Sequence, residues 1–358
     1  MVTVRAARTR RPPGHRGPRR ATPWRTAGRP GRRPPGGRAR RVRRWAAAAA
    51  AALLLTAGAC GGGDEEQGGP SGEEETTARS PFTGRTAQQQ PVLAVKLDNA
   101  RVARPHTGLA AADLVYVEQV EGGLSRLMAV YSSRLPDRAG PVRSARESDL
   151  ELLRQFGEPA LAYSGVRSAL RDDLRSAPLV RVPPAEAGDA YVRSGAAAPH
   201  NLYVRPEAAL SAAPGASEPR DIGFRFGPAP DGGSPEDRRT VRYPSARFAF
   251  SWSGEEDRWL VTMDGSPART TDGTRLGAPT VVVQEVTMRP SRFRDTTGAV
   301  TPYIESVGSG EATVLRNGRA YDVTWERPSA ADGTVFTRQN GERMPFARGP
   351  VWIVYAER

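Results

Sequence analysis

The sequence predicts an α+β fold in which an N-terminal mixed α/β domain is followed by a mostly antiparallel, β-rich C-terminal domain. Residues 91–222 alternate short apolar runs with helix-like patterns, whereas residues 223–358 contain a succession of strand-like runs separated by Gly-containing turns. The change falls in residues 211–235, which are dense in Pro, Gly and Ser and are typical of a linker. We therefore expect two domains, 91–222 and 223–358.

Strands open the N-terminal domain. Glu121-Gly122-Gly123 separates two of the apolar runs and is typical of a hairpin turn. A helix is expected to begin at Ser144, because Ser144 and Glu147 have the spacing of a capping box and apolar side chains follow at helical spacing. The complete prediction is strands over 92–98, 114–120, 124–131 and 159–163, and helices from 144 and over 166–175.

The C-terminal domain is expected to consist of strands joined by hairpins. Asn317-Gly318 lies between two alternating runs and favours a two-residue hairpin turn. Asn340-Gly341 repeats this signal ahead of the last apolar run. The expected strands cover 246–251, 258–263, 280–288, 303–307, 312–315, 320–325 and 349–355.

The charge of the chain is concentrated at its N-terminus. The 358 residues carry a formal charge of +13, yet residues 1–44 contain sixteen Arg and no acidic residue. The remainder sums to −3, so the basic pI does not indicate a nucleic-acid binder, and no nucleic-acid partner is expected. The unusual length of this Arg-rich segment leaves the translation start open between Met1 and Val42.

Residues 1–59 are typical of an Arg-rich leader followed by a secretory signal peptide. A positive segment precedes an apolar run that is too short to span a bilayer stably. The small residues 57–59 directly before Cys60 resemble the bacterial lipobox, which implies cleavage before Cys60 and diacylation of its thiol. We expect a protein anchored by lipid to the outer face of the cell membrane, with residues 60–90 as a flexible acidic tether. The alternative is an uncleaved anchor or a buried free Cys60.

Several dense motifs occur in order along the chain, and together they resemble the DUF3048 family of bacterial YerB-like lipoproteins. The resemblance implies an exported lipoprotein with two domains and no established enzymatic activity. It also implies Gln as often as His at position 106. The motifs are 96–99 (Lys-Leu-Asp-Asn), 104–109 (Arg-Pro-His-Thr-Gly-Leu), 112–116 (Ala-Asp-Leu-Val-Tyr), 121–126 (Glu-Gly-Gly-Leu-Ser-Arg), 140–146 (Gly-Pro-Val-Arg-Ser-Ala-Arg), 199–203 (Pro-His-Asn-Leu-Tyr), 304–310 (Ile-Glu-Ser-Val-Gly-Ser-Gly), Trp325 and 350–353 (Pro-Val-Trp-Ile).

Arginines around the expected helix start form a candidate anion site. Arg143, Ser144 and Arg146 would combine guanidinium groups with free backbone N–H groups. Arg104 and Arg126 are expected to converge on the same place. The alternative is that these arginines pair internally with Asp98, Asp113 or Glu121 and only hold strands and loops together.

A catalytic alternative uses the acidic residues of the same region. Asp98 and Glu121 could serve as general acid and base, with His106 near the chemistry and the arginines holding substrate. His200, Asn201 and Tyr203 are expected to close a structural loop back over the sheet. The single cysteine excludes disulfides and Cys-based zinc sites, the His spacing favours no metal, and no cofactor fingerprint is found.

The sequence therefore favours a lipid-anchored extracytoplasmic protein that binds a partner over an enzyme. The expected partners are the cytoplasmic membrane, through Cys60, and either a cell-wall polymer or an envelope protein. The alternative is a cell-wall-active hydrolase or transferase using Asp98, Glu121 and His106. The sequence leaves the ligand, the partner and the oligomeric state open.

Overall fold

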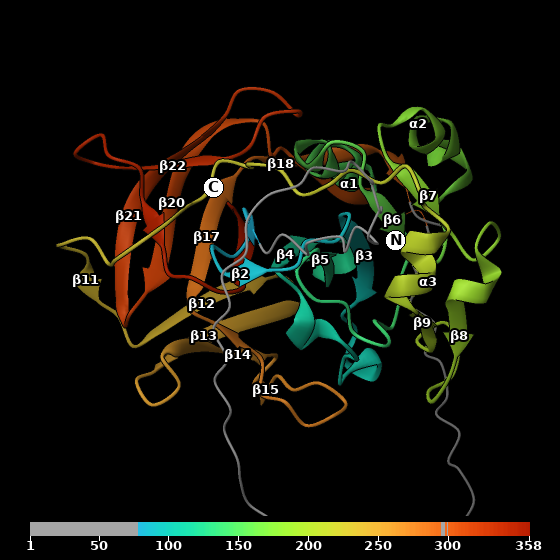
Figure 1. The fold of residues 1–358 in the computed structure, drawn as a ribbon, viewed down its shortest axis with the longest axis horizontal. Helices are drawn as coiled ribbons and strands as arrows, with labels where there is room; N and C mark the ends of the chain where they lie inside the picture. Colours follow the sequence, from blue (N-terminus) through green and yellow to red (C-terminus); the bar gives the residue numbers. More distant parts are fainter. Residues whose placement is uncertain (1–77, 295–297, 299) are drawn as a thin grey trace, which may run out of the picture. The chain divides into compact units, whose positions relative to one another are not determined.

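Apolar runs from both halves of the chain join one β-sheet (Figure 1). The computed structural model describes residues 78–294, 298 and 300–358. Eleven of the strands within these residues form this main sheet. Its order is β11 (Ser234–Pro235), β21 (Arg319–Arg327), β20 (Gly308–Arg316), β17 (Thr280–Val286), β24 (Val351–Glu357), β4 (Leu114–Gln119), β5 (Ser125–Tyr131), β3 (Leu93–Asp98), β6 (Ala160–Ala162) and β7 (Val180–Val182), and β22 (Val335–Arg338) pairs with β21.

Strand β24 links the two expected domains. It runs parallel to β17 on one side and to β4 on the other, with Ile353 opposite Val282 and Tyr116. Its continuous apolar run suits a strand that is covered on both faces, and residues 351–355 are buried. Both segments therefore contribute to a single sheet within the compact unit Pro70–Arg358. The fold is mostly β with few helices, and the boundary between 222 and 223 stays a prediction.

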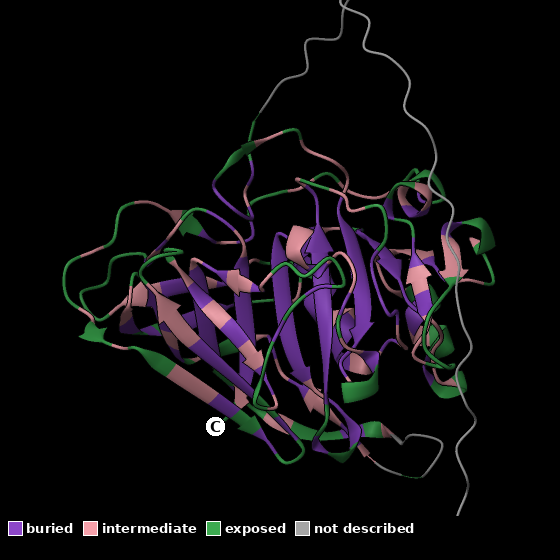
Figure 2. Ribbon diagram, turned by 90° about the horizontal axis from the view of Figure 1, so that it is seen from below, coloured by how far each residue is buried: buried purple, intermediate pink, exposed green. Residues whose placement is uncertain are grey.

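A smaller sheet covers one face of the main sheet. Phe250 of β13 packs edge-on against Trp352 at 6.1 Å between ring centroids, and the Tyr243 hydroxyl donates to the Tyr355 carbonyl at 2.6 Å. The buried strands that result are visible in Figure 2. The sheet comprises β12 (Arg238–Tyr243), β13 (Ala246–Ser253), β14 (Arg258–Met263), β15 (Ser266–Pro267) and β16 (Gly277–Ala278).

Helices α1 (Glu147–Leu153) and α2 (Arg171–Ser176) and a hairpin cover the opposite face (Figure 1). Helix α3 (Pro206–Ser211) packs instead on the same face as the smaller sheet, because Ala209 lies in the buried cluster that contains Val95 and Phe250. The 3-10 turns are η1 (Arg101–Ala103), η2 (Leu109–Ala111), η3 (Glu121–Gly123), η4 (Arg154–Phe156), η5 (Ser168–Leu170) and η6 (Gly188–Ala190). The small strand pairs are β18 (Met288–Arg294) with β19 (Val300–Ile304), β8 (Tyr191–Arg193) with β9 (Leu202–Val204), β10 (Arg225–Phe226) with β23 (Pro345–Phe346), and β1 (Ala78–Arg79) with β2 (Thr86–Ala87).

The helix expected at Ser144 begins three residues later, so the predicted capping box is wrong. Arg146 occupies the cap position, and its backbone N–H donates to the Asp149 carboxylate at 2.7 Å. The Glu147 carboxylate instead accepts hydrogen bonds from the side chains of Ser291 and Arg292 in β18. Tertiary contacts have overridden the local pattern. The helix expected over 166–175 is likewise shorter, since α2 covers only Arg171–Ser176 after the turn η5.

The two Asn-Gly signals have different outcomes. Asn317 and Gly318 both have positive φ, 50° and 69°, and join β20 to β21, which confirms the two-residue hairpin. At the second signal only Gly341 has positive φ, and the Arg338 N–H bonds the Glu342 carbonyl in a wider turn. The chain then leads to β23, whose partner β10 is parallel, and to β24, whose partners are parallel too. Thr337 pairs antiparallel with Arg343 across this turn, so the chain does reverse at Asn340-Gly341, but the returning arm is a short segment rather than the last apolar run.

Candidate functional site

A pocket of about 610 Å³ lies where strands β3, β4 and β5 meet. Antiparallel register places Arg126 of β5 opposite both Asp98, at the end of β3, and Glu118, near the end of β4. The segment before α1 and the β8–β9 connection close the other sides. Its lining is Asp98, Ala100, Val120, Glu121, Gly122, Leu124, Ser125, Arg126, Arg143, Ser144, Arg146, Val166, Arg167 and His200.

Arg126 is a buried cation without a carboxylate partner of its own. It is 8% exposed, and Nη1 donates to the Ser144 carbonyl at 2.9 Å, its one side-chain hydrogen bond within the described part of the chain. Burial and the neighbouring Arg146 guanidinium lower the pKa of Arg126 to about 9. The Arg126 guanidinium is buried in a pocket wall despite the unfavourable free energy of its desolvation. A cation in that position is typical of a site that receives an anion.

The two arginines predicted around the helix start are both paired with acidic residues. Arg143 Nε lies 3.3 Å from Asp98 Oδ2, and Arg146 Nε lies 2.5 Å from Glu121 Oε1. The second contact is an ion pair without an aligned hydrogen bond, because that Nε has no hydrogen-bond acceptor among the described residues. The alternative of internal pairing thus holds for Arg143 and Arg146, while Arg126 remains uncompensated.

Glu121 is held ionised on the pocket wall. Burial alone would raise its pKa, but the Arg146 guanidinium outweighs burial and the pKa of Glu121 is lowered. The Thr301 hydroxyl of β19 also donates to Glu121 Oε1 at 2.8 Å. The Glu121 carboxylate is therefore paired with Arg146 and hydrogen-bonded to Thr301 in the β18–β19 hairpin.

His200 joins the pocket, although the sequence suggested a purely structural loop. Its Nδ1 lies 2.7 Å from Asp98 Oδ2, so Asp98 is shared between His200 and Arg143. Asn201 and Tyr203 lie outside the lining. The Asn201 side chain accepts a hydrogen bond from Arg193 at 2.7 Å, and Tyr203 packs over Gly140. These two contacts fit the expected loop closure.

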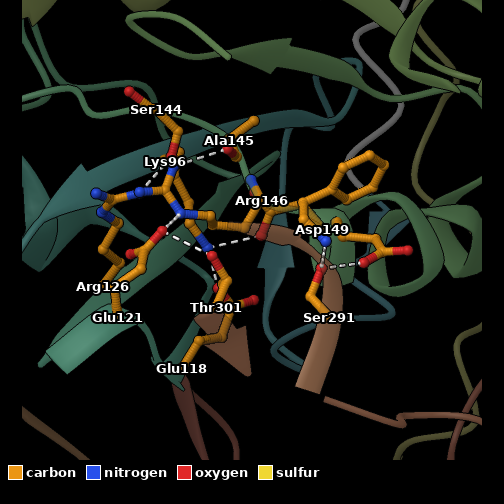
Figure 3. A network of polar contacts seen from close by, with 12 residues as sticks. Lys96, Glu118, Glu121, Arg126, Ser144, Ala145, Arg146, Asp149, Ser291 and Thr301 are labelled. Atoms are coloured by element: carbon orange, nitrogen blue, oxygen red, sulfur yellow. Dashed lines mark hydrogen bonds and ion pairs between the residues drawn. The ribbon is translucent and has the colours of Figure 1, made fainter. Parts of the chain in front are cut away.

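Beneath the pocket lies a buried ionic triad that sequence reasoning largely missed. Figure 3 shows Lys96 between Glu118 and Asp149, next to the side chains of Arg126 and Arg146. Lys96 Nζ donates to Glu118 and, at 2.6 Å, to Asp149 Oδ1. Burial lowers the pKa of Lys96 to about 8. The signal for this group was the chain's only lysine, set in an apolar strand.

Arg104 does not converge with Arg126, so that expectation is wrong. Its Nη1 lies 2.9 Å from Asp264 Oδ2, while Nε and Nη2 donate to the side chain and carbonyl of Asn99. The partner Asp264 stands 160 residues away in the sequence, in the turn between β14 and β15. Arg104 fastens the η1 loop to the smaller sheet.

His106 also lies outside the pocket lining. It is 1% exposed, and its Nε2 hydrogen-bonds the Asp98 carbonyl at 2.8 Å. Burial lowers the pKa of His106 to about 4, so the ring is neutral at physiological pH. His106 thus holds the backbone of Asp98, whose carboxylate faces the pocket.

Arg167 completes the cationic wall and was not singled out from the sequence. It lines the pocket, and its Nη1 is buried without a hydrogen bond to any described residue. It directly precedes η5, within the segment 166–175 for which the sequence predicted only a helix and no binding residue. No sequence signal identified it.

The pocket can bind an anion through guanidinium groups alone. Helix α1 has only seven residues and starts after Arg146, so the expected contribution of a helix terminus at Ser144 disappears. Four arginines face two carboxylates in the lining, which leaves a net charge of +2 from these six side chains. Guanidinium groups suit bidentate binding of carboxylate or phosphate oxygens.

The described residues contain no group of three or more His, Cys, Asp or Glu side chains placed to hold a metal ion. No helix within 78–294 or 300–358 is long and apolar enough to cross a bilayer.

Known proteins resemble this chain in sequence and in structure. It is 39% identical over 83 residues to a Bacillus subtilis (strain 168) protein named "Putative lipoprotein YerB", a match that covers 22% of this chain and only 25% of the relative. The crystal structure of YerB protein from Bacillus subtilis superposes with a TM-score of 0.67 at 21% identity, covering 78% of this chain and 96% of that one. At this identity the superposition shows a shared fold.

Family models match both halves of the chain. The model described as protein of unknown function (DUF3048) N-terminal domain matches residues 76–219, and the corresponding C-terminal domain matches residues 239–353. The first match contains every residue of the pocket lining, and the second contains β17, β20, β21, β22 and the beginning of β24. The chain therefore belongs to the DUF3048 family.

Proposed function

We propose that this chain is a lipid-anchored extracytoplasmic envelope protein that binds an anionic cell-envelope component in the pocket around Arg126. The observation that carries the proposal is Arg126 itself, a buried guanidinium with one hydrogen bond to a carbonyl and no carboxylate partner among the described residues. An anion bound there would supply the missing charge and replace the lost hydration. The component is either a wall polymer or an acidic segment of an envelope protein.

The anchoring part of the proposal rests on Cys60, which lies outside the described residues. Three small residues precede Cys60, an acidic Gly-rich stretch follows it, and the Bacillus subtilis relative is named as a lipoprotein. Membrane fractions of cells that express the wild-type chain or Cys60→Ala test this part. We expect the wild type in the membrane fraction and the variant released from it. Equal membrane association of both would contradict lipid anchoring.

A cell-wall-active enzyme using Asp98, Glu121 and His106 is less well supported. Asp98 and Glu121 are each committed to an arginine, and His106 is buried behind the pocket with a lowered pKa. A general acid and base need protons that can move to and from a bound substrate. The geometry favours binding over turnover.

Calorimetric titration with inorganic pyrophosphate at low ionic strength tests the binding site. We expect saturable binding to the full chain, weakened about tenfold or more in Arg126→Met, because hydrogen bonds to a charged group contribute roughly 1.5–3 kcal/mol. Arg242→Ala is the matched control, since Arg242 is an exposed arginine of β12 away from the pocket. Absence of saturable heat, or equal weakening by both variants, would remove the support for this function.

A further inference from the structure

We propose that the anion bound in this pocket is a doubly charged phosphate group carried on an apolar chain, as in the headgroup of a membrane lipid phosphate. The inference rests on the proposed anion-binding function, and it names a lipid in place of the wall polymer or acidic protein segment considered there. Three features carry it: the charge of the lining, the free donors, and apolar side chains beside the cations.

The charge of the lining matches a dianion. The negative charge of Asp98 balances Arg143, and that of Glu121 balances Arg146. The two cations of the lining without a carboxylate partner among the described residues are Arg126 and Arg167. A phosphate monoester carries roughly −1.5 to −2 charges at neutral pH, which balances the two. A single carboxylate or a phosphodiester carries one charge and would leave one of these cations unpaired.

The donors also suit a group with several oxygens. Arg126 uses Nη1 for the Ser144 carbonyl, so its Nε and Nη2 have no acceptor among the described residues. Nη1 of Arg167 is likewise without an acceptor. A terminal phosphate presents three acceptor oxygens, which allows a fork from Arg126 and a further bond from Arg167.

Apolar side chains also line the pocket. Leu124 is 47% exposed and stands in the lining together with Val120 and Val166. An exposed leucine alone indicates nothing. Here, however, it is one of only two exposed large apolar side chains in the described residues, Val102 at 65% being the other, and it lies beside the arginines.

Apolar side chains next to cations fit an amphipathic ligand. A free phosphate or a sugar phosphate would leave Leu124 in water, whereas an acyl or prenyl chain would cover it. A chain held at the membrane by lipid on Cys60, as proposed above, lies next to such molecules. These arguments favour a lipid source over a soluble one.

The test compares three ligands by calorimetry on the full chain carrying Cys60→Ala, which has no lipid of its own. Short-chain phosphatidic acid, kept monomeric, supplies a phosphate monoester on an apolar chain. Short-chain phosphatidylglycerol supplies the apolar chain with one charge, and glycerol 3-phosphate supplies the dianion without the chain. We expect phosphatidic acid to bind about tenfold or more tightly than either of the others.

Two pairs of variants separate the charged and apolar contributions. Leu124→Ser should weaken phosphatidic acid about tenfold and leave glycerol 3-phosphate unchanged, while the control Val102→Ser changes neither. Arg167→Ala should weaken both dianions, while the control Arg242→Ala changes neither. Arg167 and Leu124 are partly exposed, so both variants are expected to fold.

Each part of the proposal is contradicted by a different titration result. Equal binding of phosphatidic acid and glycerol 3-phosphate, unaffected by Leu124→Ser, overturns the apolar carrier. Equal binding of phosphatidic acid and phosphatidylglycerol overturns the dianion. Both results leave anion binding at Arg126 standing. If none of the three ligands and no inorganic pyrophosphate binds saturably, the proposed function fails together with this inference.

Discussion

Arg126 is kept charged in a place where charge is costly. It is largely removed from water, and its nearest charged neighbours include the like-charged Arg146. The structure compensates it only with the Ser144 carbonyl and with carboxylates that already serve other arginines. A protein selected for stability alone would gain by placing an apolar side chain there. The proposed anion-binding function would account for an arginine at this position.

Arg126→Met should therefore stabilise the protein while weakening anion binding about tenfold or more. We expect the free energy of unfolding in urea to rise by about 1 kcal/mol, because an uncompensated buried charge is replaced by an apolar chain of similar length. Arg104→Met is the matched control, and it should lower the free energy of unfolding by about 1–2 kcal/mol because Asp264 Oδ2 and the Asn99 carbonyl lose the hydrogen bonds that Arg104 donates. Greater destabilisation by Arg126→Met than by the control would contradict a binding role.

His106 predicts a specific loss of stability in acid. Its pKa is lowered from 6.5 to about 4 in the fold, mainly by burial, so the unfolded chain binds the proton more readily between these values. The free energy of unfolding should fall by about 3 kcal/mol as the pH decreases from 6.5 towards 4. His106→Gln keeps a donor for the Asp98 carbonyl and does not titrate, so urea unfolding of this variant should show a flatter profile over that range. An identical slope in both proteins would argue against this origin.

At the residue scale, the sequence locates most of the pocket because the pocket follows from strand register. Asp98, Glu121 and Arg126 stand at the ends of strands that the apolar runs predict, and neighbouring strand ends meet. Arg104 was misplaced because its partner Asp264 lies on an element whose docking has no local signal. Arg167 reaches the pocket only through the way the segment before η5 folds over the sheet, which local spacing does not indicate either. Long-range ion pairs cannot be inferred from spacing.

At the scale of elements, the β18–β19 hairpin fastens the C-terminal half onto α1 and the pocket. Glu151 of α1 accepts hydrogen bonds from the Tyr303 hydroxyl at 2.7 Å and from the Ser306 N–H at 2.9 Å. The Ser148 hydroxyl oxygen accepts a hydrogen bond from the Ile304 N–H at 2.9 Å, and the Thr301 hydroxyl donates one to Glu121 Oε1. These contacts explain why α1 begins at Glu147: its first turns are fixed by the hairpin rather than by a cap at Ser144.

Glu151→Ala should loosen this hairpin. Removing the carboxylate leaves the Ser306 N–H and the Tyr303 hydroxyl without their acceptor, at a cost of about 2 kcal/mol in the free energy of unfolding. Hydrogen exchange should accelerate at the amides of β19 in particular. Glu158→Ala, at an exposed glutamate with no side-chain partner among the described residues, should change neither quantity. Unchanged exchange in β19 would show that the hairpin is held by other contacts.

At the scale of the whole molecule, β24 makes the two family segments interdependent. The last strand of the chain lies between β17 and β4, and its side chains are buried on both faces of the sheet. The apolar run of β24 predicted a strand, and the Asn317-Gly318 turn predicted a hairpin correctly. Parallel pairing with β4, more than 200 residues earlier, has no counterpart in local sequence pattern. Tertiary pairing of this kind decides topology without leaving a turn signal.

Deleting residues 351–358 should abolish cooperative folding of both segments. Without β24, the buried edges of β17 and β4 lose their partner strand, and each becomes an exposed template for aggregation. We expect the truncated chain to aggregate or to unfold without a sigmoidal transition when followed by circular dichroism. Deleting only residues 357–358 is the control and should preserve one cooperative transition. A stable N-terminal segment in the larger deletion would show two independent domains.

The most direct test of the central claim observes the guanidinium groups themselves. In NMR spectra of the side-chain Nε–Hε groups, titration with inorganic pyrophosphate should shift the Arg126 and Arg167 signals saturably, with a common dissociation constant, while the exposed Arg242 signal stays in place. Binding in this pocket predicts that result. Shifts that grow without saturation, or that affect Arg242 as much as Arg126, would contradict an anion-binding function for this pocket.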